Sequence, residues 1–459
     1  MDRTACAFLG QSAGVWRCAR EADAYSFFNV LTGSELFEKV ESLLPAHRER
    51  LYPPTETLSI FLAQSLSADR SCQQAVNALS VRRISTGLRA CSTHTGGYCR
   101  ARARLPLEMV RELTRYTGRW ISTHGSRPWC WRGRAVRLVD GTTLTLADTA
   151  RNQDCFPQPR SQRPGLGSPL CRMVGIMCLG TGALLDAATG PCRGKASDES
   201  ALLRSILNSI DQGDVLLGDA YYCTYFLLCA LLERGCDALF EQHGARRASI
   251  DFRCGQRLGQ RDHLIVLTKP LRKPDWMEQH AYDRAPDRLR VRELRVGGKT
   301  LVTTMLCSHT STKADLKLLY RARWNVELDL RNIKTTLGME HLSCRNPQMV
   351  LKEIWVCLLA YNLIRLMMAQ SAALAQCRPR QLSFKHTVQI WLAWSHCGFS
   401  YDHGPIIFEL IAQQRVANRP GRLEPRMVKR RPKPYTWLTR AREQTRALIR
   451  KHGHPKKVK

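Results

Sequence analysis

The stretch from Tyr320 to Lys334 constrains this chain more than any other segment of its sequence. It reads YRARWNVELDLRNIK and contains neither glycine nor proline, so its composition favours a helix. Four side chains that could bind a metal ion or a phosphate lie along it: Tyr320, Arg323, Glu327 and Lys334. At roughly 100° per residue these four positions fall within a sector of about 60°. One helix face is therefore predicted to carry a carboxylate, two cations and a phenol.

A helix face of this kind can present a metal ion to a nucleic-acid backbone. The carboxylate of Glu327 can hold a divalent metal, and the cations and the phenol can hold phosphates on either side of it. The alternative is an ordinary solvated helix face. Arg and Glu at positions i and i+4 pair on many helices, because each pair stabilises the helix by roughly 0.2–0.5 kcal/mol. The rest of the sequence is needed to distinguish a metal-binding face from a solvated one.

The net charge points to a polyanionic partner. Lys and Arg number 70 against 39 Asp and Glu, which gives a formal charge of +31 over 459 residues. Such an excess repels itself in the compact state, so we expect it to serve binding. Nucleic acid is the first candidate and an anionic membrane surface is the second. The membrane is disfavoured, because the longest apolar stretch, Ile354 to Tyr361, is far too short to span a bilayer.

The cysteines indicate a reducing compartment. The 19 cysteines include no CxxC pair and no cluster with zinc-finger spacing. In a chain of this length we expect most of them to be small buried hydrophobes rather than a disulfide scaffold. The N-terminus, MDRTACAFLG, lacks the features of a signal peptide. We therefore expect a cytoplasmic protein with no membrane partner.

The two ends of the chain differ from its middle. Residues 1–127 have helical periodicity, and 57–79 predicts two helices joined by a polar turn at 67–69, which is compatible with a helix-turn-helix. An ordinary helical hairpin fits at least as well, because the turn lacks a diagnostic residue. Residues 376–459 are basic, most densely in the Pro-rich run at 419–434, which suits disorder or an arm that follows a nucleic-acid backbone.

Residues 128–375 predict an α/β core. Three strands in a meander are followed by a helix, a strand and another helix, which is the element order of a ribonuclease-H-like core. A β-biased and basic segment at about 238–312 interrupts this order, and we interpret it as an insertion before the helix that carries Glu327. The predicted core elements are 135–139, 173–179 and 183–187 in the meander, then 199–210, 215–217 and 225–233.

Two aspartates follow apolar strands of this core. Asp140 comes directly after the strand at 135–139, and Asp219 follows the strand at 215–217. With Glu327 they make three acids from distant parts of the chain, which suits two Mg²⁺ ions about 3.5–4 Å apart. Such a site activates a water or a 3′-hydroxyl for in-line attack on phosphorus.

Each aspartate also has a simpler interpretation. Asp140 precedes Gly141, and this pair is common in turns. Asp219 has a near rival in Asp214, which opens the same strand, and Asp186 lies in another predicted strand. The residues alone leave these alternatives open.

Taken together, these residues resemble a known family. Tyr-(2)-Arg-(3)-Glu-(6)-Lys is the signature of the insertion-sequence type-four DDE transposases, which include the transposon-five-like enzymes, and this chain matches it at every position. The likeness covers about residues 30–435. It extends to VDGTTL (139–144), VLLGDAYYCTYFLL (215–228), PGLGSP (164–169) and the segment that begins at Pro347.

The resemblance implies a cut-and-paste transposase that cleaves and transfers strands at the inverted-repeat ends of an insertion sequence. The implied fold is a ribonuclease-H-like core with a β-rich insertion and a helical N-terminal domain that binds the inverted repeats. Two Mg²⁺ ions are implied as cofactors, and Mn²⁺ could substitute. The implied DDE triad, both catalytic and metal-binding, is Asp140, Asp219 and Glu327. The implied contacts to DNA phosphates are Tyr320, Arg323 and Lys334.

The resemblance also implies partners and a setting. Family members act as homodimers in a synaptic complex on double-stranded DNA, which implies a nucleoid-associated protein of a prokaryotic cytoplasm. One feature departs from the family. Characterised relatives use a Trp of the insertion to hold a flipped base during hairpin formation, whereas here the insertion contains only Trp276, with Phe252 and Tyr282 as other aromatics. The main alternative function is a catalytically inactive or domesticated DNA-binding protein.

Overall fold

The computed structural model describes most of the chain between residues 51 and 454. The described residues are 42–44, 51–85, 87–194, 197–247, 250–396, 404–416 and 438–454. The Pro-rich run at 419–434 lies outside them. Every cysteine within these ranges is a free thiol, and none of the helices within them is both long enough and apolar enough to span a membrane.

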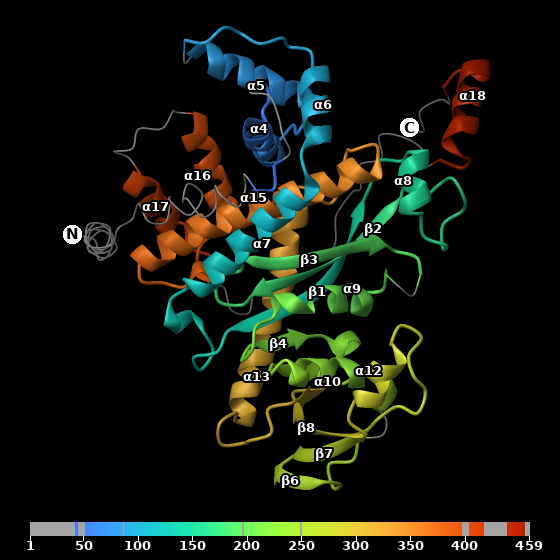
Figure 1. Ribbon diagram of the computed structural model, residues 1–459, viewed down its shortest axis with the longest axis vertical. Helices are drawn as coiled ribbons and strands as arrows, with labels where there is room; N and C mark the ends of the chain where they lie inside the picture. Colours follow the sequence, from blue (N-terminus) through green and yellow to red (C-terminus); the bar gives the residue numbers. More distant parts are fainter. Residues whose placement is uncertain are drawn as a thin grey trace.

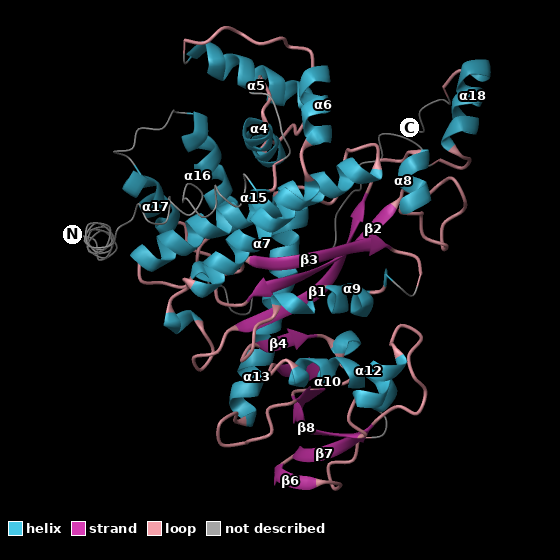
Figure 2. Cartoon of the chain, viewed as in Figure 1, coloured by secondary structure: helices cyan, strands magenta, loops and turns pink. Residues whose placement is uncertain are grey.

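A mixed sheet of nine strands forms the centre of the molecule (Figure 2). Its order is β3-β2-β1-β4-β5-β9-β8-β7-β6. β1, β2 and β3 form an antiparallel meander, whereas β4 runs parallel to β1 and β5 runs parallel to β4. The predicted α/β class and the predicted meander are therefore confirmed. The first five strands are β1 (Val136–Thr145), β2 (Leu170–Cys178), β3 (Leu184–Pro191), β4 (Val215–Gly218) and β5 (Asp237–Glu241).

The β-rich segment extends this sheet and does not form a separate one. β9 pairs antiparallel with β5, and β8, β7 and β6 follow in order. β5, which begins the segment that we interpreted as an insertion, pairs in parallel with β4. These strands are β6 (Gln256–Gly259), β7 (Asp262–Thr268), β8 (Arg288–Val296) and β9 (Lys299–Thr303), with α11 (Gly244–Arg247) and α12 (Gln279–Arg284) between them.

Helices cover both faces of the sheet (Figure 1). Because side chains alternate along a strand, Leu138 of β1 packs in one apolar cluster and Val139 packs in another. The Leu138 cluster includes α7 (Leu107–Thr123) and α15 (Pro347–Leu374), and the Val139 cluster includes α9 (Glu199–Ser205) and α10 (Tyr225–Glu233). The core of the protein is therefore the sheet between these two helical layers.

The N-terminal helices pack on one end of α15. The two helices predicted over 57–79 are present as α4 (Pro54–Leu66) and α5 (Cys72–Ser85), and α6 (Gly96–Arg104) follows them. Their own small core contains Ile60, Val76 and Tyr98. Beyond α15 the described helices are α16 (Phe384–His396), α17 (Gly404–Gln413) and α18 (Arg442–His452).

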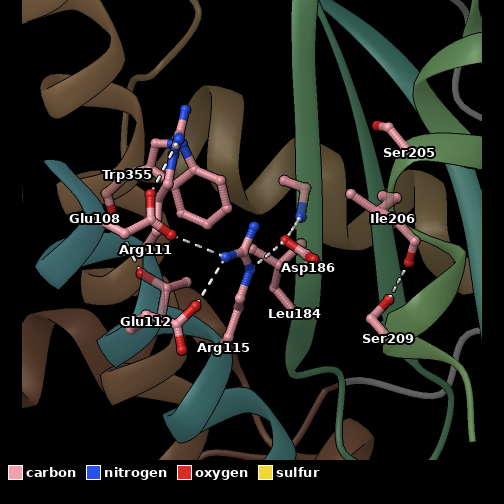
Figure 3. A network of polar contacts seen from close by, with 12 residues as sticks. Glu108, Arg111, Glu112, Arg115, Leu184, Asp186, Ser205, Ile206, Ser209 and Trp355 are labelled. Atoms are coloured by element: carbon pink, nitrogen blue, oxygen red, sulfur yellow. Dashed lines mark hydrogen bonds and ion pairs between the residues drawn. The ribbon is translucent and has the colours of Figure 1, made fainter. Parts of the chain in front are cut away.

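A polar network fastens α7 to the edge strand β3 (Figure 3). Arg115 of α7 donates from Nε to Asp186 Oδ1 of β3 at 3.0 Å. The same guanidinium pairs with Glu112 at 2.9 Å and with Glu108 at 3.3 Å. The acid in this strand, Asp186, therefore holds α7 against β3 through its ion pair with Arg115.

The segment from Tyr320 to Lys334 is helical, as predicted, but it is not one regular α-helix. α13 (Lys313–Arg321) is followed by a 3₁₀ turn (Ala322–Trp324), α14 (Asn325–Arg331) and a π turn (Asn332–Thr336). In the π turn the amide of Leu337 donates to the carbonyl of Asn332 at 3.0 Å. A 3₁₀ turn is tighter and a π turn is wider than an α-helical turn, so both change the angular positions calculated from 100° per residue.

Candidate active site

Asp140 lies in the middle of β1, opposite Gly175 of β2, and not at a strand end as the sequence suggested. Its Oδ1 accepts a hydrogen bond from the amide of Gly141 at 2.8 Å. Burial raises its pKa to about 6; that hydrogen bond and Arg323 oppose the rise, and the charges of Asp219 and Glu199 add to it. Asp140 is therefore a partly desolvated carboxylate among other acids.

Strand register brings Asp219 beside Asp140. Leu217 of β4 lies opposite Leu138 of β1, and each aspartate comes two residues later in its own strand direction. Side chains two residues apart point to the same face of a sheet, so the two carboxylates lie on one face. Oδ1 of Asp219 accepts from the amide of Tyr221 at 2.8 Å, at the start of a 3₁₀ turn (Ala220–Tyr222).

Glu327 joins this group through Arg323. Nη2 of Arg323 donates to Glu327 Oε1 at 3.0 Å, and Nη1 lies 3.9 Å from Asp140 Oδ2. The guanidinium therefore lies between the carboxylate of the helix and the carboxylate of the sheet. Within the part of the chain that the structure describes, no three His, Cys, Asp or Glu side chains are close enough to hold a metal ion.

Tyr320 precedes Arg323 and Lys334 follows it along the segment, and the charges of Tyr320 and Arg323 interact. Tyr320 is buried, and its hydroxyl lies 3.4 Å from Glu241 Oε2, at the end of β5. Burial raises the pKa of the Tyr320 phenol, with Glu241 adding to the rise. Lys334 is half-buried in the π turn. Only Arg323 among the three predicted phosphate contacts touches the predicted acids directly.

Glu199 is an acid near Asp140 that the sequence did not single out, and it packs on the opposite face of β1, against Gly141. It is the first residue of α9, and its carboxylate accepts from the hydroxyl of Tyr222 at 3.3 Å. A Cβ atom at Gly141 would lie 2.3–2.7 Å from the carboxylate of Glu199, so any larger residue there would displace that side chain. The pair Asp140-Gly141, which resembled a turn, therefore marks a strand position against which a second acid packs.

Trp276 of the β-rich segment packs on α9 and α10. Its ring lies 3.7 Å from the guanidinium carbon of Arg204 on α9, and edge-on to Phe226 of α10 at 6.3 Å. The indole is about half exposed, at 49%. The loop that carries Trp276 is thus packed on the helix that begins with Glu199.

Comparison with known proteins defines the class first. Residues 131–363 match the family model described as "Transposase DDE domain", a span that contains Asp140, Asp219 and Glu327. The chain is therefore a DDE transposase, a phosphoryl-transfer enzyme. It belongs to the IS4 family. It is 30% identical over 357 residues to "Transposase InsG for insertion sequence element IS4" of Escherichia coli (strain K12), which covers 73% of this chain and 76% of that protein.

Two further similarities are more distant. "Putative transposase InsZ" of the same strain is 27% identical over 108 residues, which is 23% of this chain and 35% of that protein. Among solved structures, a piggyBac transposase synaptic complex with hairpin DNA aligns with a TM-score of 0.43 and 9% identity, over 88% of each chain.

Proposed function

We propose that this transposase cleaves and transfers DNA strands at the inverted-repeat ends of its insertion sequence, in a metal-dependent cut-and-paste reaction. The observation that carries the proposal is that Asp140 lies beside Asp219, and that Arg323 lies between Asp140 and Glu327. Two of these acids come from parallel neighbouring strands, and the third comes from the signature helix. The strand order β3-β2-β1-β4-β5 supports a ribonuclease-H-like core.

The donor set fits Mg²⁺. All three side chains offer carboxylate oxygens, the donors this ion prefers. The pKa of Asp140 is raised because the carboxylate is buried near other acids, so a cation would relieve the local excess of negative charge. Asp140, Asp219 and Glu327 would hold two ions, which would neutralise charge on the attacking and leaving oxygens. Mn²⁺ would be accepted by the same oxygens.

The cations and the phenol of the signature segment would bind the DNA. Arg323 is a planar donor suited to phosphate, and here it pairs with two carboxylates. We propose that Arg323, Lys334 and Tyr320 contact phosphates at the transposon end, which holds the scissile phosphate against the three acids. No protein nucleophile is required, because a water or a 3′-hydroxyl attacks phosphorus.

Other parts of the chain would bind and pair the ends. The helical region up to residue 127 would recognise the inverted repeats, and the basic region after residue 375 would follow the DNA backbone. We propose a homodimer in the synaptic complex, in the cytoplasm of a prokaryote. Target DNA would be the second substrate of strand transfer. Trp276 carries no assigned role in a hairpin step.

The decisive experiment is Glu327→Gln. This change keeps the shape of the side chain and removes its charge. We expect Mg²⁺-dependent cleavage of end DNA to fall at least a thousandfold, while binding of the same DNA stays within about threefold. End DNA is taken from the paired inverted repeats that bracket the gene. Normal cleavage by the variant would refute the assignment.

The alternative is a DNA-binding protein that has lost catalysis. The presence of all three acids favours the enzyme. The two possibilities differ in the unaltered chain, because an inactive relative would bind the ends without cleaving them at any concentration of Mg²⁺ or Mn²⁺.

A further inference from the structure

Asp329 is a buried carboxylate on the helix that carries Glu327, and no step of the proposed reaction uses it. Its exposure is 0%. It follows Glu327 by two residues in α14, so the two side chains point in directions that differ by roughly 200°. When Glu327 faces Arg323 and Asp140, Asp329 therefore faces the interior. A charge in such a place is costly unless it is paired and hydrogen-bonded.

Two arginines clamp this carboxylate. Arg365 of α15 donates from Nη2 to Oδ1 of Asp329 at 2.5 Å. Arg380, in a 3₁₀ turn (Pro379–Gln381), donates from Nη1 to Oδ1 at 3.0 Å and from Nη2 to Oδ2 at 2.8 Å. Both oxygens are therefore held, in a bidentate arrangement that fixes direction as well as distance.

The same arginines hold the turn between β2 and β3. Arg380 donates to the carbonyls of Cys178, at 3.1 Å, and of Leu179. Arg365 donates from Nε to the hydroxyl of Tyr361 at 2.8 Å, and this hydroxyl donates to the carbonyl of Gly182 at 2.7 Å. β2 in turn pairs with β1, which contains Asp140. Asp329 is thus linked through guanidinium groups to the sheet that holds the aspartates.

We propose that Asp329, acting through Arg365 and Arg380, is the positioning residue for Glu327. The inference rests on the function proposed above. α14 has seven residues and lies between a 3₁₀ turn and a π turn, so regular helix geometry on either side does not fix its rotation. Apolar packing is non-directional, whereas a bidentate carboxylate fixes one rotation of the helix. The clamp sets the direction in which Glu327 faces Arg323 and, across it, Asp140.

The test compares two arginines, each of which forms a bidentate ion pair with a buried aspartate. Arg380→Lys keeps a cation but removes the planar fork that holds Asp329. Arg292→Lys is the matched control: Arg292 is fully buried, pairs with Asp262 at 2.5 and 2.7 Å, and lies in β8, away from α14. Both changes should lower Tm. Only the first should alter the direction of Glu327.

The readout is metal binding without turnover. The full chain is bound to pre-cleaved end DNA and titrated with Mn²⁺, and free Mn²⁺ is followed by electron paramagnetic resonance. We expect Arg380→Lys to raise the Kd for Mn²⁺ about tenfold, and to raise the Mg²⁺ concentration for half-maximal cleavage of intact ends by a similar factor. Arg292→Lys should change neither, and DNA affinity should stay within about twofold for both variants.

A milder variant covers the case in which Arg380→Lys does not fold. Tyr361→Phe removes only the bonds from Arg365 to the Tyr361 hydroxyl and from that hydroxyl to Gly182, and should raise the Kd for Mn²⁺ about threefold. Equal Mn²⁺ affinities in Arg380→Lys, Arg292→Lys and the unaltered chain would overturn the positioning role, as would an unchanged affinity in Tyr361→Phe where Arg380→Lys does not fold. If Glu327→Gln also leaves Mn²⁺ binding unchanged, the proposed metal site falls as well, so the two failures are distinguishable.

Discussion

At the scale of single residues, the candidate site is a group of carboxylates with one shared cation. Asp140 lies beside Asp219 and near Glu199, and Arg323 joins Asp140 to Glu327. Burial of Asp140 among like charges stabilises its protonated form, as the pKa of about 6 indicates. Proteins often retain such destabilising groups where function needs them. The cost should be measurable in the metal-free chain.

We expect Asp140→Asn to stabilise the metal-free protein at pH 7.5. A folded pKa near 6, above the ordinary value of 3.8, means that the ionised group costs stability above pH 6. The cost is about 3 kcal/mol at most, and it shrinks as the pH falls from 6 toward 4. Urea unfolding with EDTA, at pH 7.5 and pH 4.5, measures the difference between the variant and the unaltered chain.

The control for this prediction is the same substitution at Asp214. That carboxylate is buried, at 4% exposure, and accepts from Arg137 Nε at 2.6 Å. Asp214→Asn leaves the buried guanidinium of Arg137 with only the exposed Asp211, at 3.9 Å, as a counter-charge, so it should destabilise the protein by about 3 kcal/mol at pH 7.5. An Asp140→Asn variant that is less stable than the unaltered chain at pH 7.5 would contradict the prediction.

At the scale of elements, local sequence patterns predicted individual strands and helices, whereas tertiary packing determined which of their side chains lie together. The apolar runs before Asp140 and Asp219 predicted two strands, and the parallel register of β1 and β4 then places the acids together. The signature spacing placed Glu327 on a helix. Glu199 and Asp329 could not be found in this way, because their roles depend on Gly141 and on two arginines that are distant in sequence. The 3₁₀ and π turns could not be predicted either, because the calculation assumed 100° per residue throughout the segment.

The contact between α7 and the edge strand β3 gives an element-scale prediction. Gly118 of α7 is so close to β3 that a Cβ atom there would lie 1.9 Å from the carbonyl oxygen of Leu184. Gly118→Ala must therefore push the helix off the strand, and it should destabilise the protein by about 2–3 kcal/mol. The free energy of unfolding in urea measures this cost.

The matched control is Gly96→Ala, at the start of α6. A Cβ atom at Gly96 meets only the Arg100 side chain, at the ordinary distance of 3.6 Å. Because alanine is the better helix former, this change should leave stability unchanged or raise it by up to about 1 kcal/mol. Equal effects of the two substitutions would show that the close packing of α7 on β3 contributes nothing to stability.

At the scale of the whole molecule, the exposed helix α18 carries part of the positive charge excess. The chain has a formal charge of +31. α18 has no buried residue, and it carries four cations, Arg442, Arg446, Arg450 and Lys451. A helix without a buried face gains little from the fold, so we expect its cations to serve DNA binding. α18 lies near α8 (Ala150–Cys155), where Arg442 is 4.0 Å from Asp148 (Figure 1).

The salt dependence of DNA binding tests this interpretation. Each phosphate contact contributes about 0.9 to the slope of log K against log salt, so a protein with six or more contacts has a slope of about −5 or steeper. Replacing both Arg450 and Lys451 with alanine should make the slope shallower by about 2 while Tm stays unchanged, because neither residue is buried. Gln444→Ala, an uncharged change in the same helix, should leave the slope as it is. A slope in the double variant equal to that of the unaltered chain would remove α18 from the DNA-binding surface, and a slope near zero in both would contradict the electrostatic role of the whole charge excess.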